Sequence, residues 1–345
     1  MRAVRLHEFG GPDQLRVEEV PTPEPGPGQA LVQVAACGVN HLDLWLCEGS
    51  LPVKPQLPHT PGSEVAGTVA ALGSGTTGVR EGDAVVVHPY LHCGECEFCL
   101  RGEETTCLRS DILGLISDGG YAEYVLVPAN SLVPRPAGLD AVQAAALALS
   151  AVTAWHMLSR ARLQLGETVL VWGGNSGVGS AAVQIANRMG ARVLATVGSA
   201  DKADLVQALG AEATIDHYAQ DVGRAVRDLT NKRGVDVVFE HVGQATWPAS
   251  VSALARNGRL VTCGATTGGD VGFNLWPFFA KQLQFIGCYG GTRAELATVL
   301  GLAADGALQA VVDRTYPLDG VPDALRRLAA HEQFGKLVIT NQPAT

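Results

Sequence analysis

The sequence predicts an α/β protein in which a β-rich part is joined to a doubly wound parallel sheet. Short apolar strands separated by glycine and proline turns fill the first third of the chain. From about Ala141 onward, apolar strands alternate with helical patterns, as in parallel sheets. A glycine-rich turn at 173–179 follows one of these strands and opens a helix. A chain of 345 residues has room for two domains of ordinary size.

The β-rich part is expected to contain four main strands. Runs of β-branched and apolar residues bounded by turn residues place them at 31–34, 64–72, 84–88 and 121–128. A proline-rich stretch, residues 21–28, forms an extended connection ahead of the first strand.

The second part begins with a strand–helix–strand unit at 168–172, 180–189 and 192–197. Three further strands are expected at 235–240, 258–264 and 283–287. The tail reverts to strand, helix and strand at 311–316, 323–330 and 335–340. We therefore expect residues 1–130 and 306–345 to form one domain and residues 131–305 the other.

Composition excludes several classes of function. The net charge is −9 and no basic stripe occurs, so nucleic-acid binding is not expected. The first ten residues have no apolar signal core. The longest weakly polar run, 141–158, is interrupted by Gln143, Ser150 and His156, which favours a buried helix over a membrane span. A cytoplasmic protein without a membrane partner is the expectation.

Four cysteines predict a structural zinc site. Cys93, Cys96 and Cys99 are each separated by two residues, and Cys107 follows after seven more. This spacing lets four thiolates surround one Zn²⁺ ion as a tetrahedron without an open position, which is typical of a structural site. The alternative is a pair of disulfides or free thiols, which the absence of a secretory context disfavours.

The glycine-rich turn predicts a dinucleotide site. Glycine lets the backbone approach a pyrophosphate, and the helix N-terminus attracts its charge. The residues expected to make this contact are Gly174, Asn175, Ser176, Gly177, Val178 and Gly179. The alternative is an ordinary tight turn between strand and helix.

The next strand indicates which dinucleotide is bound. NAD-binding proteins usually carry an acidic residue at its tip, which contacts the ribose 2′-hydroxyl. Here the strand ends without one, and Ser199 and Lys202 follow. They could hold a 2′-phosphate, so the sequence favours NADPH over NADH. Alternatively, Lys202 is simply solvated and Asp201 caps a helix.

The zinc loop, the glycine-rich unit and the segment Gly62-Ser63-Glu64-Val65-Ala66-Gly67 together resemble the medium-chain dehydrogenase/reductase superfamily over essentially the whole chain. That superfamily includes zinc alcohol dehydrogenases and quinone oxidoreductases. The resemblance implies a GroES-like catalytic domain, an inserted Rossmann domain, a small-molecule substrate and a homodimer or homotetramer.

Zinc-dependent members of the superfamily hold a second, catalytic zinc, and its ligands are replaced here. Asn40 stands where the first cysteine should be, Ser63 replaces the histidine, and Leu149 replaces the other cysteine. Without a Lewis acid, simple alcohols are hard to deprotonate near neutral pH. We therefore expect hydride transfer to a quinone, enone or other activated carbonyl or alkene. Asn40 and Ser63 are the candidate catalytic residues, and His41 is a candidate proton donor.

The resemblance implies further cofactor contacts at strand ends, although each of these residues could simply belong to a packed loop. They are Thr153, His217, His241, Gly243, Gly264, Tyr289 and Lys336. Lys336 could instead pair with Glu64.

Two alternative functions remain open: a zinc alcohol dehydrogenase with atypical ligands such as Cys37, His59 and Glu64, and a non-catalytic NADPH-binding redox sensor.

Overall fold

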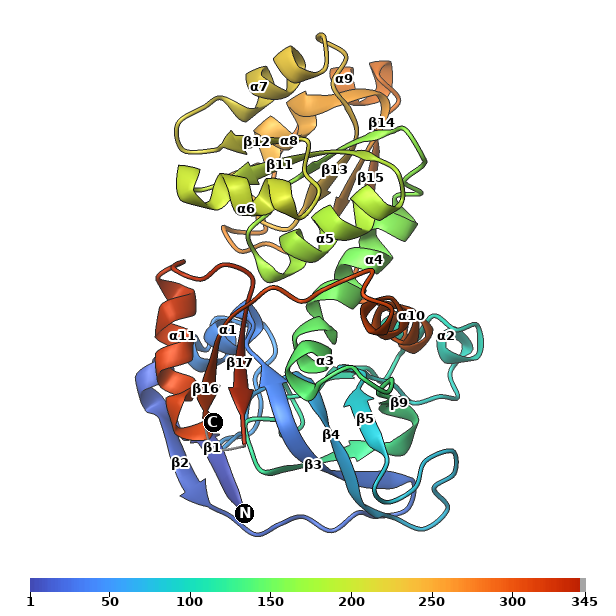
Figure 1. The fold of residues 1–345 in the computed structure, drawn as a ribbon, viewed down its shortest axis with the longest axis vertical. Coiled ribbons are helices and arrows are strands. Elements are labelled where there is room, and N and C mark those ends of the chain that lie inside the picture. Colours follow the sequence, from blue (N-terminus) through green and yellow to red (C-terminus); the bar gives the residue numbers. More distant parts are fainter. Residues whose placement is uncertain (342–345) are drawn as a thin grey trace. The chain divides into compact units, whose positions relative to one another are not determined.

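A computed structural model describes residues 1–341 and divides them into two compact units (Figure 1). Unit 1 contains residues 1–152 and 291–341, and unit 2 is Thr153–Gly290. These boundaries differ from the domain boundaries expected from the sequence, which lie at 130/131 and 305/306. Helix α3 (Ala141–Leu147) packs on the strands of unit 1, and α10 (Arg293–Ala304) packs on α3 and on a strand of that unit. Both helices therefore belong to unit 1.

Unit 1 is built around a seven-stranded sheet. The chain tail forms two of its strands, which lie beside the N-terminal elements in Figure 1. This pairing explains why the discontinuous segments form one unit, as the sequence pattern indicated. The strand order is β16 (Val312–Pro317), β17 (Lys336–Thr340), β3 (Gln29–Gly38), β4 (Glu64–Leu72), β5 (Ala84–Val87) and β9 (Leu132–Pro134), with β8 (Tyr124–Pro128) also paired to β3.

The pairing of the central strands positions the candidate site. Gly38, the last residue of β3, is in register with Glu64, the first residue of β4. On its other side, Gly38 is in register with Val338 of β17, which starts at Lys336. Three segments far apart in sequence therefore meet where β3 ends.

Several elements of unit 1 were not predicted. They include the hairpin β1 (Arg2–Leu6) and β2 (Leu15–Glu19), the helices α1 (His41–Glu48), α2 (Glu97–Leu100) and α10, and the short strands β6 (Tyr90–Leu91), β7 (Asp111–Ile112) and β9. Helix α11 (Val321–Ala329) in the tail was predicted, and it contacts α1. Apolar side chains of the tail, including Leu325 and Ile339, enter the same core as Val4 and Tyr121.

Unit 2 is a parallel, doubly wound sheet, as predicted. Its six strands run in the order β12 (Ala213–Asp216), β11 (Arg192–Val197), β10 (Thr168–Val171), β13 (Val235–Glu240), β14 (Leu254–Thr262) and β15 (Gln284–Gly287), and all of them pair in parallel. The strand order reverses between β10 and β13. In open parallel sheets, ligands bind at such a switch point, outside the carboxyl ends of the strands.

Helices connect the strands of unit 2. They are α5 (Gly177–Arg188), α6 (Ala203–Ala208), α7 (Val222–Leu229), α8 (Trp247–Ala253) and α9 (Leu275–Ala280). Helix α5 starts three residues earlier than predicted, directly at the glycine-rich turn. The fold therefore aims an intact helix N-terminus at the switch point.

The apolar run 141–158 is two helices rather than one. Helix α3 ends at Leu147, and α4 (Ser150–Arg160) begins three residues later. The break coincides with a long-range contact, because the backbone N–H groups of Leu149 and Ser150 donate to the buried carboxylate of Glu64. No single helix within residues 1–341 has the length and apolar character needed to cross a membrane; α3 and α4 together pass that test only as a pair bent by 41°.

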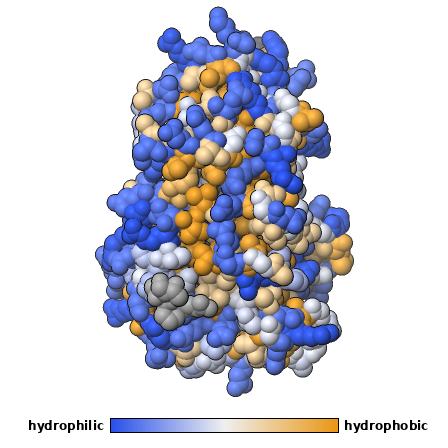
Figure 2. Space-filling view, in the orientation of Figure 1, coloured by the Kyte–Doolittle hydropathy of each residue, from blue (hydrophilic) through white to orange (hydrophobic). Residues whose placement is uncertain are grey.

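The face drawn in Figure 2 is largely hydrophilic at its outer margin. Exposed apolar side chains are concentrated on one segment of unit 2 that includes α9. Its exposed members are Val271, Phe273, Leu275, Trp276, Phe279 and Tyr289.

Candidate functional site

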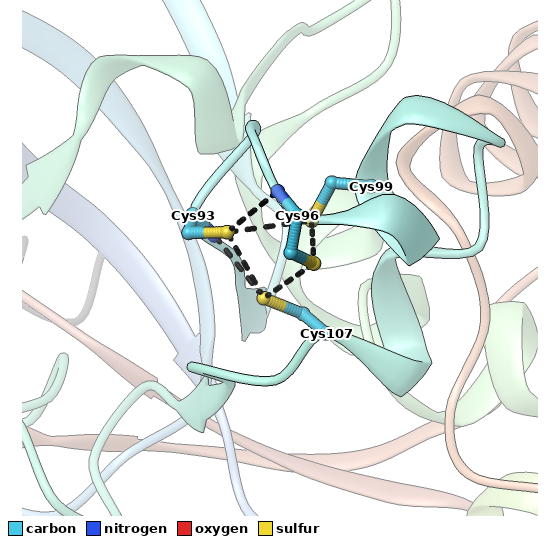
Figure 3. A group of neighbouring side chains, drawn as sticks. All are labelled: Cys93, Cys96, Cys99 and Cys107. Atoms are coloured by element: carbon cyan, nitrogen blue, oxygen red, sulfur yellow. Dashed lines mark hydrogen bonds between the residues drawn. The ribbon is translucent and has the colours of Figure 1, made fainter.

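The four predicted cysteines lie together in unit 1 (Figure 3). Their sulfur atoms all lie within 4.8 Å of one another. Sγ–Sγ separations are 3.8 Å for Cys93–Cys99, 3.5 Å for Cys96–Cys99, 3.8 Å for Cys96–Cys107 and 3.5 Å for Cys107–Cys93. Zn–S bonds of about 2.3 Å in a tetrahedron place the sulfurs roughly 3.8 Å apart. The cluster therefore fits one zinc ion.

Backbone donors support the thiolate form of these cysteines. The N–H groups of Cys93 and Arg109 donate to the Cys107 sulfur, and that of Cys96 donates to the Cys93 sulfur. Helix α2 and the short strands β6 and β7 supply the loop geometry. Four sulfur ligands leave no position for substrate, so the chemistry of this donor set is structural.

The glycine-rich turn forms an anion-binding cradle in unit 2. Ser176 caps α5, and its hydroxyl accepts a hydrogen bond from the Gly179 backbone N–H. Within residues 1–341, the N–H groups of Asn175, Gly177 and Val178 have no acceptor. A Cβ atom at Gly179 would lie 2.1 Å from the Gly173 carbonyl oxygen, so this position requires glycine. Free N–H groups at a helix N-terminus fit a dinucleotide pyrophosphate.

Ser199, predicted to hold a 2′-phosphate, follows the tip of β11, and Lys202 ends the short helical turn Ala200–Lys202 after it. His217 and Tyr218 lie over Gly198, where an added Cβ would be 3.2 Å from the Tyr218 ring and 3.6 Å from His217. Burial lowers the pKa of His217. The Ser199 hydroxyl lies against the Asp201 carboxylate and lowers its pKa. Asp201, which the sequence pattern also allowed as a helix cap, therefore lies near the tip of β11.

Other predicted contacts lie at the neighbouring strand ends of unit 2. His241 donates from Nε2 to the Trp172 carbonyl, 2.8 Å away, beside the glycine-rich turn. A Cβ at Gly243 would lie 2.5 Å from the Gly268 carbonyl, and one at Gly264 would lie 2.7 Å from that of His241. These glycines therefore let the loops after β13 and β14 pack tightly.

Two further candidates of unit 2 differ in exposure. Tyr289, after β15, is 51% exposed. Thr153 is 4% exposed, and its hydroxyl has no hydrogen-bond partner within residues 1–341.

Of the three residues that stand in place of the implied zinc ligands, Asn40 and Ser63 have polar atoms without a partner among residues 1–341. Asn40 precedes α1 and is half-buried, while Ser63 precedes β4 and is fully buried. Neither Asn40 Nδ2 nor Ser63 Oγ has a partner in the part of the chain that the structure describes. Buried polar groups are usually hydrogen-bonded, so orphans of this kind indicate a ligand.

The centre of this site is a buried ion pair between Lys336, a predicted cofactor contact, and Glu64. The Lys336 ammonium is 2.6 Å from Glu64 Oε2, and these residues are 4% and 0% exposed. It also donates to the Val39 carbonyl at 2.8 Å and to Asn40 Oδ1 at 2.7 Å. These contacts occupy the ammonium group. The alternative pairing with Glu64 is the one that the structure forms.

The atypical zinc site is not assembled. Among residues 1–341, only the four-cysteine group places three or more ligand atoms close enough to share a metal. Burial raises the pKa of the Cys37 thiol well above its usual value, which keeps it neutral. His59 donates from Nε2 to the Gly114 carbonyl at 2.9 Å and lies 3.3 Å from Asp118. Each proposed ligand is thus engaged elsewhere.

Asp43 and Tyr121 form a buried hydrogen-bonded pair that was not predicted from the sequence. The Tyr121 hydroxyl donates to Asp43 Oδ2 at 2.7 Å, and the Asn40 backbone N–H donates to the same oxygen at 2.8 Å. Burial raises the pKa of Asp43 to about 6, and these hydrogen bonds oppose the rise. The capping position of Asp43, three residues after Asn40, was the available signal. His41, next to Asn40, stacks on His331 with ring centroids 6.0 Å apart.

The fold and these sites define a dinucleotide-dependent oxidoreductase with a structural zinc loop, and comparisons with known proteins specify the family. Residues 26–137 match the alcohol dehydrogenase GroES-like domain, and residues 177–305 match the zinc-binding dehydrogenase domain.

Relatives are similar over nearly the full length. An NAD-dependent alcohol dehydrogenase of Sulfolobus acidocaldarius is 35% identical, over 98% of this chain and 99% of its own. A quinone oxidoreductase of Rattus norvegicus is 32% identical, over 98% and 97%. A solved structure of an NAD-dependent alcohol dehydrogenase superposes with a TM-score of 0.95 at 39% identity, covering 99% of this chain and 100% of that one.

The chain therefore belongs to the medium-chain dehydrogenase/reductase superfamily of NAD(P)-dependent oxidoreductases. The predicted family and fold class are confirmed.

Removing zinc is expected to unfold its loop before it affects unit 2. Chelation, or a Cys99→Ser substitution, should raise amide exchange in residues 92–109 by about tenfold or more, because the ligands are the main constraint on this loop. Exchange in β10 and α5 should be unchanged. Cys263→Ser, outside the cluster, is the matched control. An equal rise in amide exchange in residues 92–109 and in β10 and α5 after zinc loss would contradict a local structural role of zinc.

The buried carboxyl of Asp43 is expected to make stability pH-dependent. Its folded pKa of about 6 lies above the ordinary value of 3.8, so the folded state holds the proton more tightly. The contribution of Asp43 is then fully present below about pH 4 and declines as the pH rises through 6. Asn has no such charge, so Asp43→Asn should gain stability relative to wild type between pH 4.5 and 7.5, on the order of 2–3 kcal/mol. Denaturant unfolding measures this, and a pH-independent difference would refute it.

Proposed function

We propose that this protein transfers hydride from NADPH to a quinone, an enone or another activated carbonyl or alkene, without a catalytic zinc. The observation that carries the proposal is the trio Asn40, Glu64 and Lys336. A buried ammonium ion pairs with Glu64 and holds Asn40, while Asn40 Nδ2 has no partner within residues 1–341. An unpaired amide donor suits a carbonyl oxygen.

The residues of this chain would contribute binding and charge stabilisation. The bound dinucleotide supplies the hydride. Asn40 Nδ2 would donate to the acceptor oxygen as negative charge develops there, and the Ser63 hydroxyl could be a second donor. Conjugation in a quinone or enone already stabilises that charge, so two neutral donors suffice where an alcohol would need a metal. His41 is the nearest candidate in sequence for returning a proton to the reduced oxygen.

A zinc alcohol dehydrogenase with atypical ligands is the second candidate, because several relatives carry that name. The engaged states of Cys37, His59 and Glu64 weigh against it. A non-catalytic NADPH-binding sensor would need the anion-binding turn at 175–178. It would not account for the buried Asn40 Nδ2 donor without a partner among residues 1–341.

The preference for NADPH rests on Ser199 and Lys202 after β11. No acid stands at the tip itself, where NAD-binding proteins hold the ribose hydroxyl. Asp201 opposes this preference, since its carboxylate lies against Ser199 and would repel a 2′-phosphate. We propose NADPH as the better cofactor with NADH also accepted.

The protein is proposed to act in the cytoplasm as a homodimer or homotetramer. A reducing compartment would keep four cysteine thiolates available to zinc. The outer strand β15 of the unit 2 sheet has an unpaired edge, and the neighbouring segment exposes the apolar side chains of α9. Exposed edges and apolar patches favour association.

Acceptor reduction tests the function. Oxidation of NADPH and NADH should be measured with benzoquinones, enones and simple aldehydes. Turnover is expected with the first two groups, and Asn40→Ala should lower kcat by about tenfold to a hundredfold while the dissociation constant of NADPH stays the same. Turnover confined to alcohols and aldehydes would favour the second candidate, and none with any acceptor would favour the sensor.

Cofactor choice has a separate test. Lys202→Ala should weaken NADPH binding by about tenfold and leave NADH binding nearly unchanged, because only the 2′-phosphate pairs with the ammonium. Asp201→Asn is the matched control and should strengthen NADPH binding. Titration of dinucleotide fluorescence measures both, and equal effects of Lys202→Ala on the two cofactors would contradict the preference.

A further inference from the structure

We infer that Lys336 is a positioning residue that fixes the direction of the Asn40 amide, so that Nδ2 and not Oδ1 faces the acceptor. The inference rests on the proposed function, because it assigns Asn40 its partner. It goes further by assigning the buried Lys336–Glu64 pair a role in orienting the Asn40 amide.

The chemistry of the two groups determines the direction. An ammonium group has three donors and no acceptor, and an amide has one end of each kind. Lys336 Nζ donates to Asn40 Oδ1 at 2.7 Å. Turning the amide over would place an NH₂ group against an ammonium group, donor against donor, and would lose a charge-assisted hydrogen bond. The Asn40 amide is therefore held in one of its two orientations.

That orientation leaves Nδ2 as the free end. Nδ2 is buried and has no partner among residues 1–341. The backbone of Asn40 is fixed as well, because its N–H donates to Asp43 Oδ2, which also accepts from the Tyr121 hydroxyl. A donor with a fixed backbone and a fixed amide is preorganised for a carbonyl oxygen.

The ammonium is itself held in place. It donates to the Val39 carbonyl at 2.8 Å and pairs with Glu64 Oε2 at 2.6 Å. The other oxygen of Glu64 accepts from the N–H groups of Leu149 and Ser150, at 2.8 and 2.9 Å. A series of contacts thus runs from the start of α4 through Glu64 and Lys336 to Asn40.

These contacts also exclude a proton-donor role for Lys336. The side chain is 4% exposed, and its ammonium faces two oxygen acceptors and one carboxylate. Its contribution is orientation, so its removal should alter the acceptor step and leave cofactor binding unchanged.

A mutant cycle tests the inference. Lys336→Met is combined with Glu64→Gln, because removing the ammonium alone would leave a buried carboxylate without a partner. With NADPH and 1,4-benzoquinone as the probe, the double variant should lose about tenfold in kcat/KM at an unchanged dissociation constant of NADPH. In an Asn40→Ala background, the same pair of substitutions should cause no further loss, since the group that Lys336 orients is gone.

The outcomes separate the two proposals. If the loss of kcat/KM in the triple variant equals the product of the losses in Asn40→Ala and in the double variant, the positioning role of Lys336 is overturned. The catalytic role of Asn40 would then remain. Wild-type kcat/KM in Asn40→Ala would instead overturn the role of Asn40 in the proposed function. Lys336→Arg retains the charge and donors, and it should recover most of the activity of the wild type.

Asparagine-selective ¹⁵N spectra of the wild-type protein provide a test that does not depend on the folding of the double variant. The side-chain NH₂ signal of Asn40, assigned by its loss in Asn40→Ala, should shift when cyclohexanone binds in the presence of NADP⁺. The signal of Asn130, which donates to the His92 carbonyl near the zinc loop, is the control and should stay in place. An unshifted Asn40 signal at saturating ketone would overturn the inference.

Discussion

The buried ion pair between Lys336 and Glu64 is the interaction on which the rest of unit 1 depends. It joins the start of the last strand, β17, to the start of β4, with exposures of 4% and 0%. Burying two charges costs free energy that only close pairing and further hydrogen bonds offset. The extra bonds are present, to the N–H groups that begin α4 and to the Val39 carbonyl. Loss of either partner alone would leave a buried charge, at a cost of about 3–5 kcal/mol.

The four-cysteine loop and the Lys336–Glu64 pair of unit 1 have different consequences. The four-cysteine loop provides a closed site suited to a structural zinc ion. Asn40, Ser63 and Leu149 supply an amide, a hydroxyl and an apolar side chain, none of which is a soft metal ligand. An ammonium group from the chain tail supplies the positive charge there. A lysine cannot polarise an alcohol as zinc does, and for this reason we propose acceptors that are already electrophilic.

Much of this arrangement could be predicted from sequence, because it depends on local patterns. Cysteine spacing, the turn at 173–179 and the alternation of strands and helices each report on neighbours in the chain. The exceptions are long-range. The break between α3 and α4 depends on Glu64, over eighty residues earlier, and the Asn40–Lys336 bond joins the two ends of the chain. The buried acid Asp43 was missed because its partner, Tyr121, lies on a distant segment.

The number of zinc ions bound by fully active protein tests most directly the central proposal that the protein works without a catalytic zinc. Metal analysis of purified protein that reduces quinone should give one zinc per chain, with that zinc lost in Cys99→Ser. Two zinc ions per chain, with quinone reduction abolished when the second is removed, would contradict the account.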